Sequence, residues 1–239
     1  MSSRTKSLPH YANFYGTVIE IMPRLVAEGR VLMPTFSLMR RKLETSTLTN
    51  ITQLAKQTCL SDCVVTADAP VYHPDGTMKI ALETEYLRQL NKKSRLVNGV
   101  LVLEDGAYEG IDDRLKLTAE EIRDYTGRHL SRKDALDNRI WRILARHPDE
   151  VPREYAYAEG AELLEEYVGA VYKYGISDDL RMGINVTSPK HPMPTMRFWN
   201  IHGFGNKSVA RGWEKLDEGI YHAIGVIPRA KLKHKVRIA

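Results

Sequence analysis

The sequence of 239 residues predicts an α+β fold with helical N-terminal and central segments, mostly antiparallel β units and a β-rich C-terminal region. Three observations support this class. Apolar side chains recur with helical spacing near the N-terminus, a hairpin signal lies between β-branched runs in the middle of the chain, and short strand-like runs dominate after residue 181. Because helices and strands come in separate groups, the order differs from the strict alternation of a doubly wound fold.

The first part of the chain is expected to be helical. Apolar residues from Tyr11 to Val26 follow a helical period, with Gly29 as the expected end of the helix. Pro23 should kink this helix or split it, because proline removes a backbone donor and its ring clashes with the preceding turn. Two further helices are expected, over residues 36–43 and from about residue 49.

The middle of the chain is expected to form a small β unit. The segment His73-Pro74-Asp75-Gly76 is typical of a hairpin turn, because proline and Asp-Gly favour the backbone angles of a tight reversal. The strands expected around this turn are residues 63–65, 71–72, 78–82 and 100–103.

Two capping boxes predict helix starts in the central segment. Thr118 and Ser131 are each followed three residues later by an acid, a pattern that satisfies free backbone N–H groups at the start of a helix. The second of these helices should stop before Pro148. The remaining elements expected are a helix over 152–174, strands over 181–187, 196–201, 220–227 and 229–239, and a short helix over 209–216.

The expected elements suggest two segments. Residues 1–116 would hold helices followed by a small β unit, and residues 117–239 a helical segment followed by a basic, β-rich region. A chain of this length can also bury its core as a single domain, and that alternative stays open.

Positive charge is concentrated in the C-terminal quarter. Residues 177–239 contain 11 Lys and Arg against 5 Asp and Glu, whereas residues 1–176 contain 24 against 25. At the end of the chain, a cation occupies every second position five times. In an extended strand these cations would share one face, about 7 Å apart, which suits a polyanion. The alternative is an exposed edge strand whose lysines prevent pairing. The row consists of Arg229, Lys231, Lys233, Lys235 and Arg237.

A second candidate for nucleic-acid binding is the segment 196–208, which combines aromatic rings, cations and a Gly-X-Gly turn. Bases can stack on aromatic rings, and glycines allow backbone N–H groups to approach phosphates. We expect Trp199 or Phe204 to stack on bases and Lys207 and Arg211 to support phosphate binding. The alternative is that aromatic residues of this strand belong to the core.

Through Gly203-Phe204-Gly205 and Gly212-Trp213, this segment resembles the glycine-rich loops of ferredoxin-like RNA-binding proteins of the CRISPR-associated class. The resemblance covers about a dozen residues and lacks the second Gly-X-Gly. It implies RNA, in preference to DNA, as the ligand. The segment matches neither a P-loop nor a dinucleotide-binding pattern.

Signals for catalysis are confined to His202, which lies between a strand and a glycine turn and could act as an acid or base. The alternative is an ordinary hydrogen-bonded histidine. Cys59 and Cys63 are four positions apart, which does not match a zinc knuckle or a redox pair, so reduced thiols are expected. We expect no metal and no cofactor.

Four arginines fall on one stripe of the helix that follows Ser131. Such a stripe can lie along phosphates or pair with acids, and the nearby Asp134 and Asp137 favour pairing. The arginines are Arg132, Arg139, Arg142 and Arg146.

Together these features predict a non-enzymatic component of a larger assembly that binds RNA or single-stranded DNA. One alternative is a structural or assembly protein, such as a shell or scaffold subunit, that oligomerises through its terminal segments. The other is a metal-independent nuclease that uses His202. Other subunits or further copies of the chain are expected as partners. The polar N-terminus and the lack of a long apolar run predict a cytoplasmic protein without membrane contact.

Overall fold

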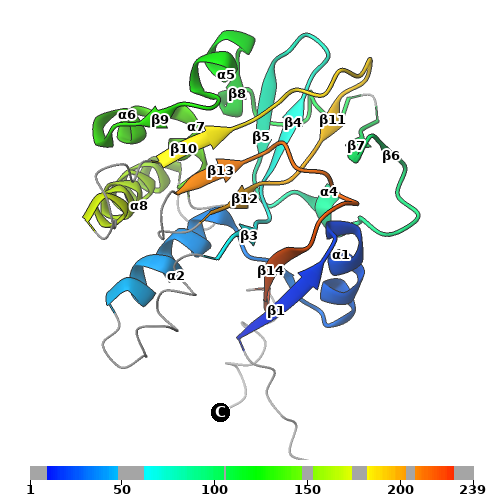
Figure 1. The fold of residues 1–239 in the computed structure, drawn as a ribbon, viewed down its shortest axis with the longest axis horizontal. Coiled ribbons are helices and arrows are strands. Elements are labelled where there is room, and N and C mark those ends of the chain that lie inside the picture. The colour runs from blue at the N-terminus through cyan, green and yellow to red at the C-terminus, as the bar shows by residue number, and fades with distance from the viewer. Residues whose placement is uncertain are drawn as a thin grey trace, which may run out of the picture.

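The fold consists of two sheets with helices packed around them (Figure 1). The computed structural model describes residues 10–47, 62–104, 106–146, 153–173, 182–202 and 208–228. Within these ranges the large sheet has eight strands and the small sheet has six. Most strand pairs are antiparallel, and the strands after residue 181 lie mainly in the large sheet. The predicted α+β class is therefore confirmed.

The large sheet joins strands from both ends of the chain. Its centre pairs β14 in parallel with β3, and β10 pairs in parallel with β13. In spatial order, its strands are β1 (Tyr11–Gly16), β14 (Tyr221–Val226), β3 (Val64–Val65), β12 (Asn200–Ile201), β13 (Val209–Arg211), β10 (Met182–Asn185) and β9 (His129–Leu130), and β2 (Val31–Leu32) also pairs with β14.

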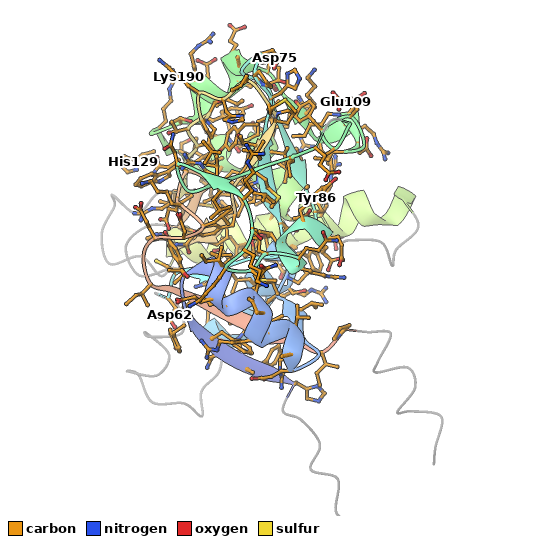
Figure 2. All side chains as sticks on the ribbon, turned by 90° about the vertical axis from the view of Figure 1, so that its right-hand side faces the viewer. Asp62, Asp75, Tyr86, Glu109, His129 and Lys190 are labelled. Carbon is orange, nitrogen blue, oxygen red and sulfur yellow. The ribbon has the colours of Figure 1, made fainter. Side chains whose placement is uncertain are left out.

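The small sheet contains the predicted hairpin, in which β4 and β5 pair from Ala69↔Ala81 to Tyr72↔Met78. Gly76 has a φ of 87°, which a side chain would disfavour, and Asp75 lies at the tip of the turn (Figure 2). In spatial order, the strands are β6 (Leu96–Val97), β7 (Val100–Val102), β11 (Thr195–Met196), β4 (Ala69–Tyr72), β5 (Met78–Ala81) and β8 (Lys116–Leu117).

Both predicted capping boxes are confirmed, at Thr118 with Glu121 and at Ser131 with Asp134. The helix expected to run to Arg146 is interrupted at Asn138, whose side chain accepts the N–H groups that start the next helix. The helices are α1 (Val18–Ala27), α2 (Thr35–Thr47), α4 (Glu85–Arg88), the 3₁₀ turn η1 (Asp113–Leu115), α5 (Ala119–Tyr125), α6 (Arg132–Asp137), α7 (Arg139–Leu144) and α8 (Arg153–Lys173).

The helix predicted from Tyr11 to Val26 is wrong in its first part. Tyr11 to Gly16 form strand β1, because the six residues pair antiparallel with β14. The helix begins after Thr17, which forms a capping box with Glu20, and Pro23 lies inside it without splitting it. Local spacing alone could not reveal a strand partner more than 200 positions away in the sequence.

The short helix expected over residues 209–216 is also wrong, because the first residues of this segment form strand β13 between β12 and β10. Backbone bonds to two neighbouring strands override a weak helical pattern here. The strand expected over 196–201 is divided between the two sheets, as β11 and β12. The helix expected from about residue 49 lies outside the described residues.

Two apolar clusters lie on opposite faces of the large sheet. One contains side chains of α2 and α8 with Trp199 and Ile201, and the other contains side chains of α1 with Phe198 and Val65. Because alternate residues of a strand face opposite sides, neighbouring aromatic residues enter different clusters. The end of this sheet therefore offers two separate faces.

A buried carboxylate ties the start of α2 to the sheets. Asp68 Oδ2 accepts the backbone N–H of Thr35 at 2.8 Å, and its Oδ1 accepts the N–H of Glu83 at 2.9 Å. Burial raises the pKa of the Asp68 carboxyl. The two hydrogen bonds hold three segments of the chain in place.

The division suggested at residue 116 does not separate the sheets. The large sheet combines β1, β2 and β3 with strands from residues 129–226, and the small sheet takes β11 from the second segment. The two segments are interleaved in both sheets, as the single-domain alternative requires.

Candidate functional site

The candidate site lies where β3 and β12 meet at one end of the large sheet. Ile201, the last residue of β12, pairs with Val64, the first residue of β3. His202, which follows β12, therefore lies beside Cys63, which precedes β3. The Cys63 Sγ lies 2.9 Å from the His202 Nδ1. Both side chains are half-buried.

Burial keeps both groups of this pair neutral. It raises the pKa of the Cys63 thiol, and it lowers the pKa of His202 to about 4, aided by the positive charges of Arg211 and Lys42. With both groups neutral, the Cys63 thiol can donate its proton to Nδ1, and the imidazole proton then sits on Nε2. The ring thus presents a hydrogen-bond donor to whatever faces Nε2.

Asn200 and Arg211 extend the site along the paired strands β12 and β13, where they lie opposite each other. Glu214 joins them, because its carboxylate accepts the Asn200 Nδ2 at 3.1 Å and lies 3.5 Å from the Arg211 Nη1. Burial, together with Glu214, raises the pKa of the Tyr221 hydroxyl. The carboxylate of Glu214 balances the positive charge of Arg211 within the site.

Three polar atoms of the site are buried and have no hydrogen-bond partner among the described residues: Asn200 Oδ1, His202 Nε2 and Arg211 Nε. Asn200 in β12 pairs with Arg211 in β13, and His202 is two residues after Asn200, so all three side chains share one face of the sheet. An unsatisfied buried polar group costs roughly 1–3 kcal/mol. Two donors and one acceptor in one place are therefore available to a ligand.

Exposed apolar side chains lie next to these polar atoms in the sequence. Trp213 precedes Glu214 and is 45% exposed, and Ile220 precedes Tyr221 and is 86% exposed. Tyr221 packs edge-on against Phe198, at 4.9 Å between ring centroids. The segment between β13 and β14 thus carries exposed apolar side chains next in sequence to Glu214 and Tyr221, and we call Trp213, Ile220 and Tyr221 the apolar rim.

The structure describes three of the predicted binding and catalytic residues, and it separates Trp199 from His202 and Arg211. Arg211 and the weak catalytic candidate His202 belong to the site, although Arg211 faces Glu214 and its Nε has no partner among the described residues. Trp199 is completely buried on the opposite face, so the prediction that it stacks on bases is wrong. Outside the described residues lie Lys207, Phe204, Arg229, Lys231, Lys233, Lys235 and Arg237.

Sequence reasoning missed three members of the site, Cys63, Asn200 and Glu214. The alternation of Asn200 and His202 was a usable signal, because residues two apart share a face of a strand. The pairing with Cys63 had no such signal, since the two residues are 139 positions apart.

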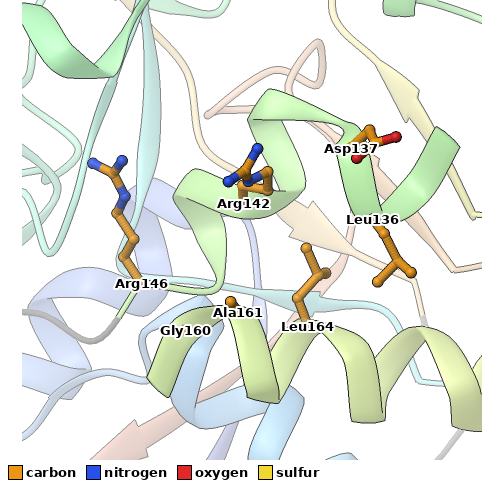
Figure 3. Close-up of a pocket in the computed structure, with 7 residues that line it drawn as sticks. All are labelled: Leu136, Asp137, Arg142, Arg146, Gly160, Ala161 and Leu164. Atoms are coloured by element: carbon orange, nitrogen blue, oxygen red, sulfur yellow. The ribbon is translucent and has the colours of Figure 1, made fainter. Parts of the chain in front are cut away.

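The arginine stripe lies elsewhere, beside α8 (Figure 3). Arg139 pairs with Glu121 at 3.0 Å, as the pairing interpretation expects. Arg142 and Arg146 line a pocket of about 200 Å³, and burial with neighbouring arginines lowers the pKa of Arg146. The other residues lining the pocket are Leu136, Asp137, Gly160, Ala161 and Leu164.

Among the side chains that the structure describes, no three His, Cys, Asp or Glu residues gather closely enough to hold a metal ion. No helix within the described ranges is long and apolar enough to cross a membrane.

No family model matches the chain, and no curated protein matches it. Among solved structures, it resembles a protein reported as "Accommodation of massive sequence variation in Nanoarchaeota by the C-type lectin fold". The TM-score is 0.61 at 13% identity, and the match covers 90% of this chain and 97% of that chain. The chain has a C-type lectin fold.

Of the residues that resemble loops of ferredoxin-like RNA-binding proteins, Gly203, Phe204 and Gly205 lie outside the described residues. Gly212 serves packing here, because a Cβ at this position would lie 2.9 Å from both Pro70 and Trp199. At 13% identity the likeness concerns the fold alone and transfers no binding residue.

Proposed function

We propose that this protein is a non-enzymatic recognition protein that binds a partner protein through the face formed by Asn200, His202 and Arg211. The observation that carries the proposal is the group of three buried polar atoms on that face that have no hydrogen-bond partner in the part of the chain that the structure describes. Buried polar groups in native proteins are nearly always hydrogen-bonded, so a cluster of exceptions marks a place that a ligand completes.

The donors and the acceptor select a neutral polar ligand. Asn200 Oδ1 can accept from an N–H or O–H group, while His202 Nε2 and Arg211 Nε can donate to a carbonyl or hydroxyl. Glu214 offsets the charge of Arg211, so a free anion would meet an opposing carboxylate. Backbone and side-chain amides of a protein supply both kinds of group.

The apolar rim supports a protein in preference to a small solute. Tryptophan, tyrosine and arginine are enriched at the energetic centres of protein interfaces, and Trp213, Tyr221 and Arg211 provide one of each. Ile220 is 86% exposed and would be covered by such a partner.

The tautomer of His202 supports binding in preference to acid–base catalysis. When Nδ1 accepts the thiol proton of Cys63, Nε2 carries the ring proton, and in that tautomer neither nitrogen has a free lone pair to remove a proton from a substrate. The nuclease alternative stays a prediction, and turnover of labelled RNA in EDTA by wild type but not by His202→Ala would support it.

The fold offers a suitable framework. The nanoarchaeal protein accommodates massive sequence variation on the C-type lectin fold. A scaffold of this kind separates buried residues that determine the fold, such as Trp199, from side chains free to suit a partner. The proposal assigns that second role to Asn200, His202 and Arg211.

A peptide-display selection tests the proposal. Peptides enriched on the full chain should bind Asn200→Leu and Arg211→Leu at least tenfold more weakly, a change of about 1.4 kcal/mol. Arg95→Gln, an exposed arginine elsewhere, is the control and should bind as the wild type does. Peptides that bind all three variants equally would show that recognition takes place at another face.

A further inference from the structure

A groove of about 600 Å³ lies between α1 and the turn that follows α4. Both elements lie at the same end of the molecule (Figure 1). Four residues of α1 and three residues of the turn line the groove, and all seven lie within the described ranges. The groove shares no residue with the site formed by Asn200, His202 and Arg211. It is therefore a second candidate surface for binding.

The apolar part of the groove comes from one side of α1. Ile19, Pro23 and Val26 are four and three positions apart, so they form a stripe beside the buried side of this helix. Ile19 is half-buried and Pro23 is exposed, and both line the groove. Val26 continues the stripe and is 48% exposed. Apolar side chains exposed in a row suit contact with the apolar side chains of a partner.

The other wall of the groove is a turn fixed by local hydrogen bonds. Asn91 Oδ1 accepts the backbone N–H of Lys93 at 2.9 Å. The backbone N–H of Asn91 donates to Ser94 Oγ at 3.0 Å, and the N–H of Ser94 donates to the Asn91 carbonyl oxygen at 2.9 Å. Asparagine side chains that bond the backbone two residues on are typical of tight turns. Lys92 and Lys93 therefore extend from a fixed backbone, and both are exposed.

Positive charge exceeds negative charge in the lining of the groove, which contains three cations and one acid. The acid is Glu20, whose Oε1 lies 3.0 Å from the Lys92 Nζ. Arg24 Nη1 donates to the carbonyl oxygen of Tyr15 at 3.0 Å, a neutral group that leaves the charge of the guanidinium unbalanced. Lys93 forms no ion pair with a residue that the structure describes. Two cations of the groove are therefore available to a carboxylate.

Acids on the neighbouring elements have cationic partners of their own. Glu28, which follows α1, lies 3.3 Å from the Arg30 Nε, and Glu85 of α4 lies 2.9 Å from the Arg88 Nη1. These acids therefore do not cancel the two unpaired cations of the groove.

We propose that this groove binds an acidic segment of a partner protein, whose apolar side chains contact Ile19 and Pro23 and whose carboxylates pair with Arg24 and Lys93. Complementary charge across an interface speeds association and rejects partners of like charge. Clustered cations that bind an acidic motif are a recurring mode of peptide recognition. Nucleic acid is a poorer match, because the described lining holds apolar side chains and no aromatic ring on which bases could stack.

The experiment is a fluorescence-anisotropy titration of the full chain, at low salt, with a labelled peptide of leucine and glutamate. The comparison is the same peptide with glutamine in place of glutamate. The glutamate peptide should bind at least tenfold more tightly, because only its side chains can pair with the unbalanced cations. Equal affinities for the two peptides would overturn the proposal.

Two variants change the charge of the groove in opposite directions. Arg24→Gln with Lys93→Gln removes the unpaired cations and should weaken binding of the glutamate peptide about tenfold. Glu20→Gln removes the acid of the lining and should strengthen binding about threefold. Glutamine at this position preserves the capping box with Thr17. Lys133→Gln, which removes an exposed lysine of α6, is the matched control and should bind as the wild type does.

Urea denaturation of each variant measures whether the fold is intact. Lys93→Gln alone changes only an exposed side chain of the turn and should still weaken binding about threefold, even if Arg24→Gln destabilises α1. Asn200→Leu should bind the glutamate peptide as the wild type does. Three further results would overturn the proposal: no binding of the glutamate peptide, an unchanged affinity in Lys93→Gln, or a loss of affinity in Asn200→Leu.

Discussion

The two faces at the end of the large sheet differ in how they could bind a ligand. The recognition face, formed by Asn200, His202 and Arg211, holds buried polar atoms in fixed positions. The positive charge of its arginine is balanced by Glu214. The face of β1 that carries Tyr11 and Tyr15 presents exposed aromatic rings, with the Arg41 guanidinium 4.3 Å from the centroid of the Tyr11 ring. Hydrogen-bonding groups in fixed positions select ligands by shape and by matching donors and acceptors. Binding of a polyanion releases its counterions, and its affinity therefore depends on salt. The two faces therefore differ in the chemical groups that they offer to a ligand.

The largest expected effect comes from removing the buried Asp68 carboxylate, which ties the start of α2 to the sheets. Asp68→Ala leaves the N–H groups of Thr35 and Glu83 buried without acceptors, so the free energy of unfolding should fall by about 3 kcal/mol. Urea denaturation measures this, with the exposed Asp217→Ala as a control that should change it by less than about 0.5 kcal/mol. A normal stability of Asp68→Ala would show that the carboxylate does not hold these segments.

Salt concentration should distinguish most clearly between single-strand binding by the terminal cations and peptide binding at the recognition face, because only the first affinity should depend strongly on salt. If five terminal cations contact phosphates, raising salt from about 50 to 200 mM should weaken single-strand binding about a hundredfold. Peptide binding at the recognition face should change by less than about threefold, because its charges are paired locally. The same salt dependence for both ligands would contradict the assignment of separate faces, and anisotropy titrations with each probe measure it.

Asn200→Leu should separate binding from stability at the recognition face. The substitution removes Oδ1, a buried acceptor that has no partner among the described residues, and this should stabilise the fold. It also removes the hydrogen bond from Nδ2 to Glu214, which should destabilise the fold, so the two contributions to the free energy of unfolding nearly cancel. The free energy of unfolding should stay within about 1 kcal/mol of the wild type while peptide binding is lost. A large loss of stability, measured by urea denaturation, would identify Asn200 as a structural residue.

The smallest expected effect is the part of the pH dependence of stability that comes from His202, since burial also lowers the pKa of His222 on the other face. Its pKa is lowered from 6.5 to about 4, so the unfolded chain binds a proton at a higher pH than the folded chain does. Stability should therefore be unaffected by this group above pH 6.5 and should fall as pH drops from 6.5 toward 4. His202→Gln should flatten the midpoint of unfolding against pH in this window, and an unchanged profile would exclude His202 as its cause.

Local sequence signals predicted several elements correctly for physical reasons. The hairpin at His73 to Gly76 and the capping boxes at Thr118 and Ser131 depend on contacts between residues two to four apart. The strand over 220–227 was predicted by its apolar run and corresponds to β14. Where a contact is local, the residues that make it are already visible in the sequence.

Other features could not be predicted, because they depend on partners far away in the chain. Residues 11–16 carry a helical pattern, yet pairing with residues 221–226 makes them a strand. Trp199 and Phe198 look equally suited to stacking, and only the orientation of β12 sends both into the core. Tyr11 and Tyr15 are exposed whereas Trp199 is buried, and this difference could be known only from the fold.

The sequence by itself determined the α+β class, the local turns and caps, and the concentration of positive charge toward the C-terminus, because each follows from composition or from neighbours along the chain. Only the tertiary structure decided that Cys63, Asn200, His202 and Arg211 meet, since strand register brings together residues up to 148 positions apart. Register is fixed by which apolar side chains must enter the core, and that depends on the whole chain at once.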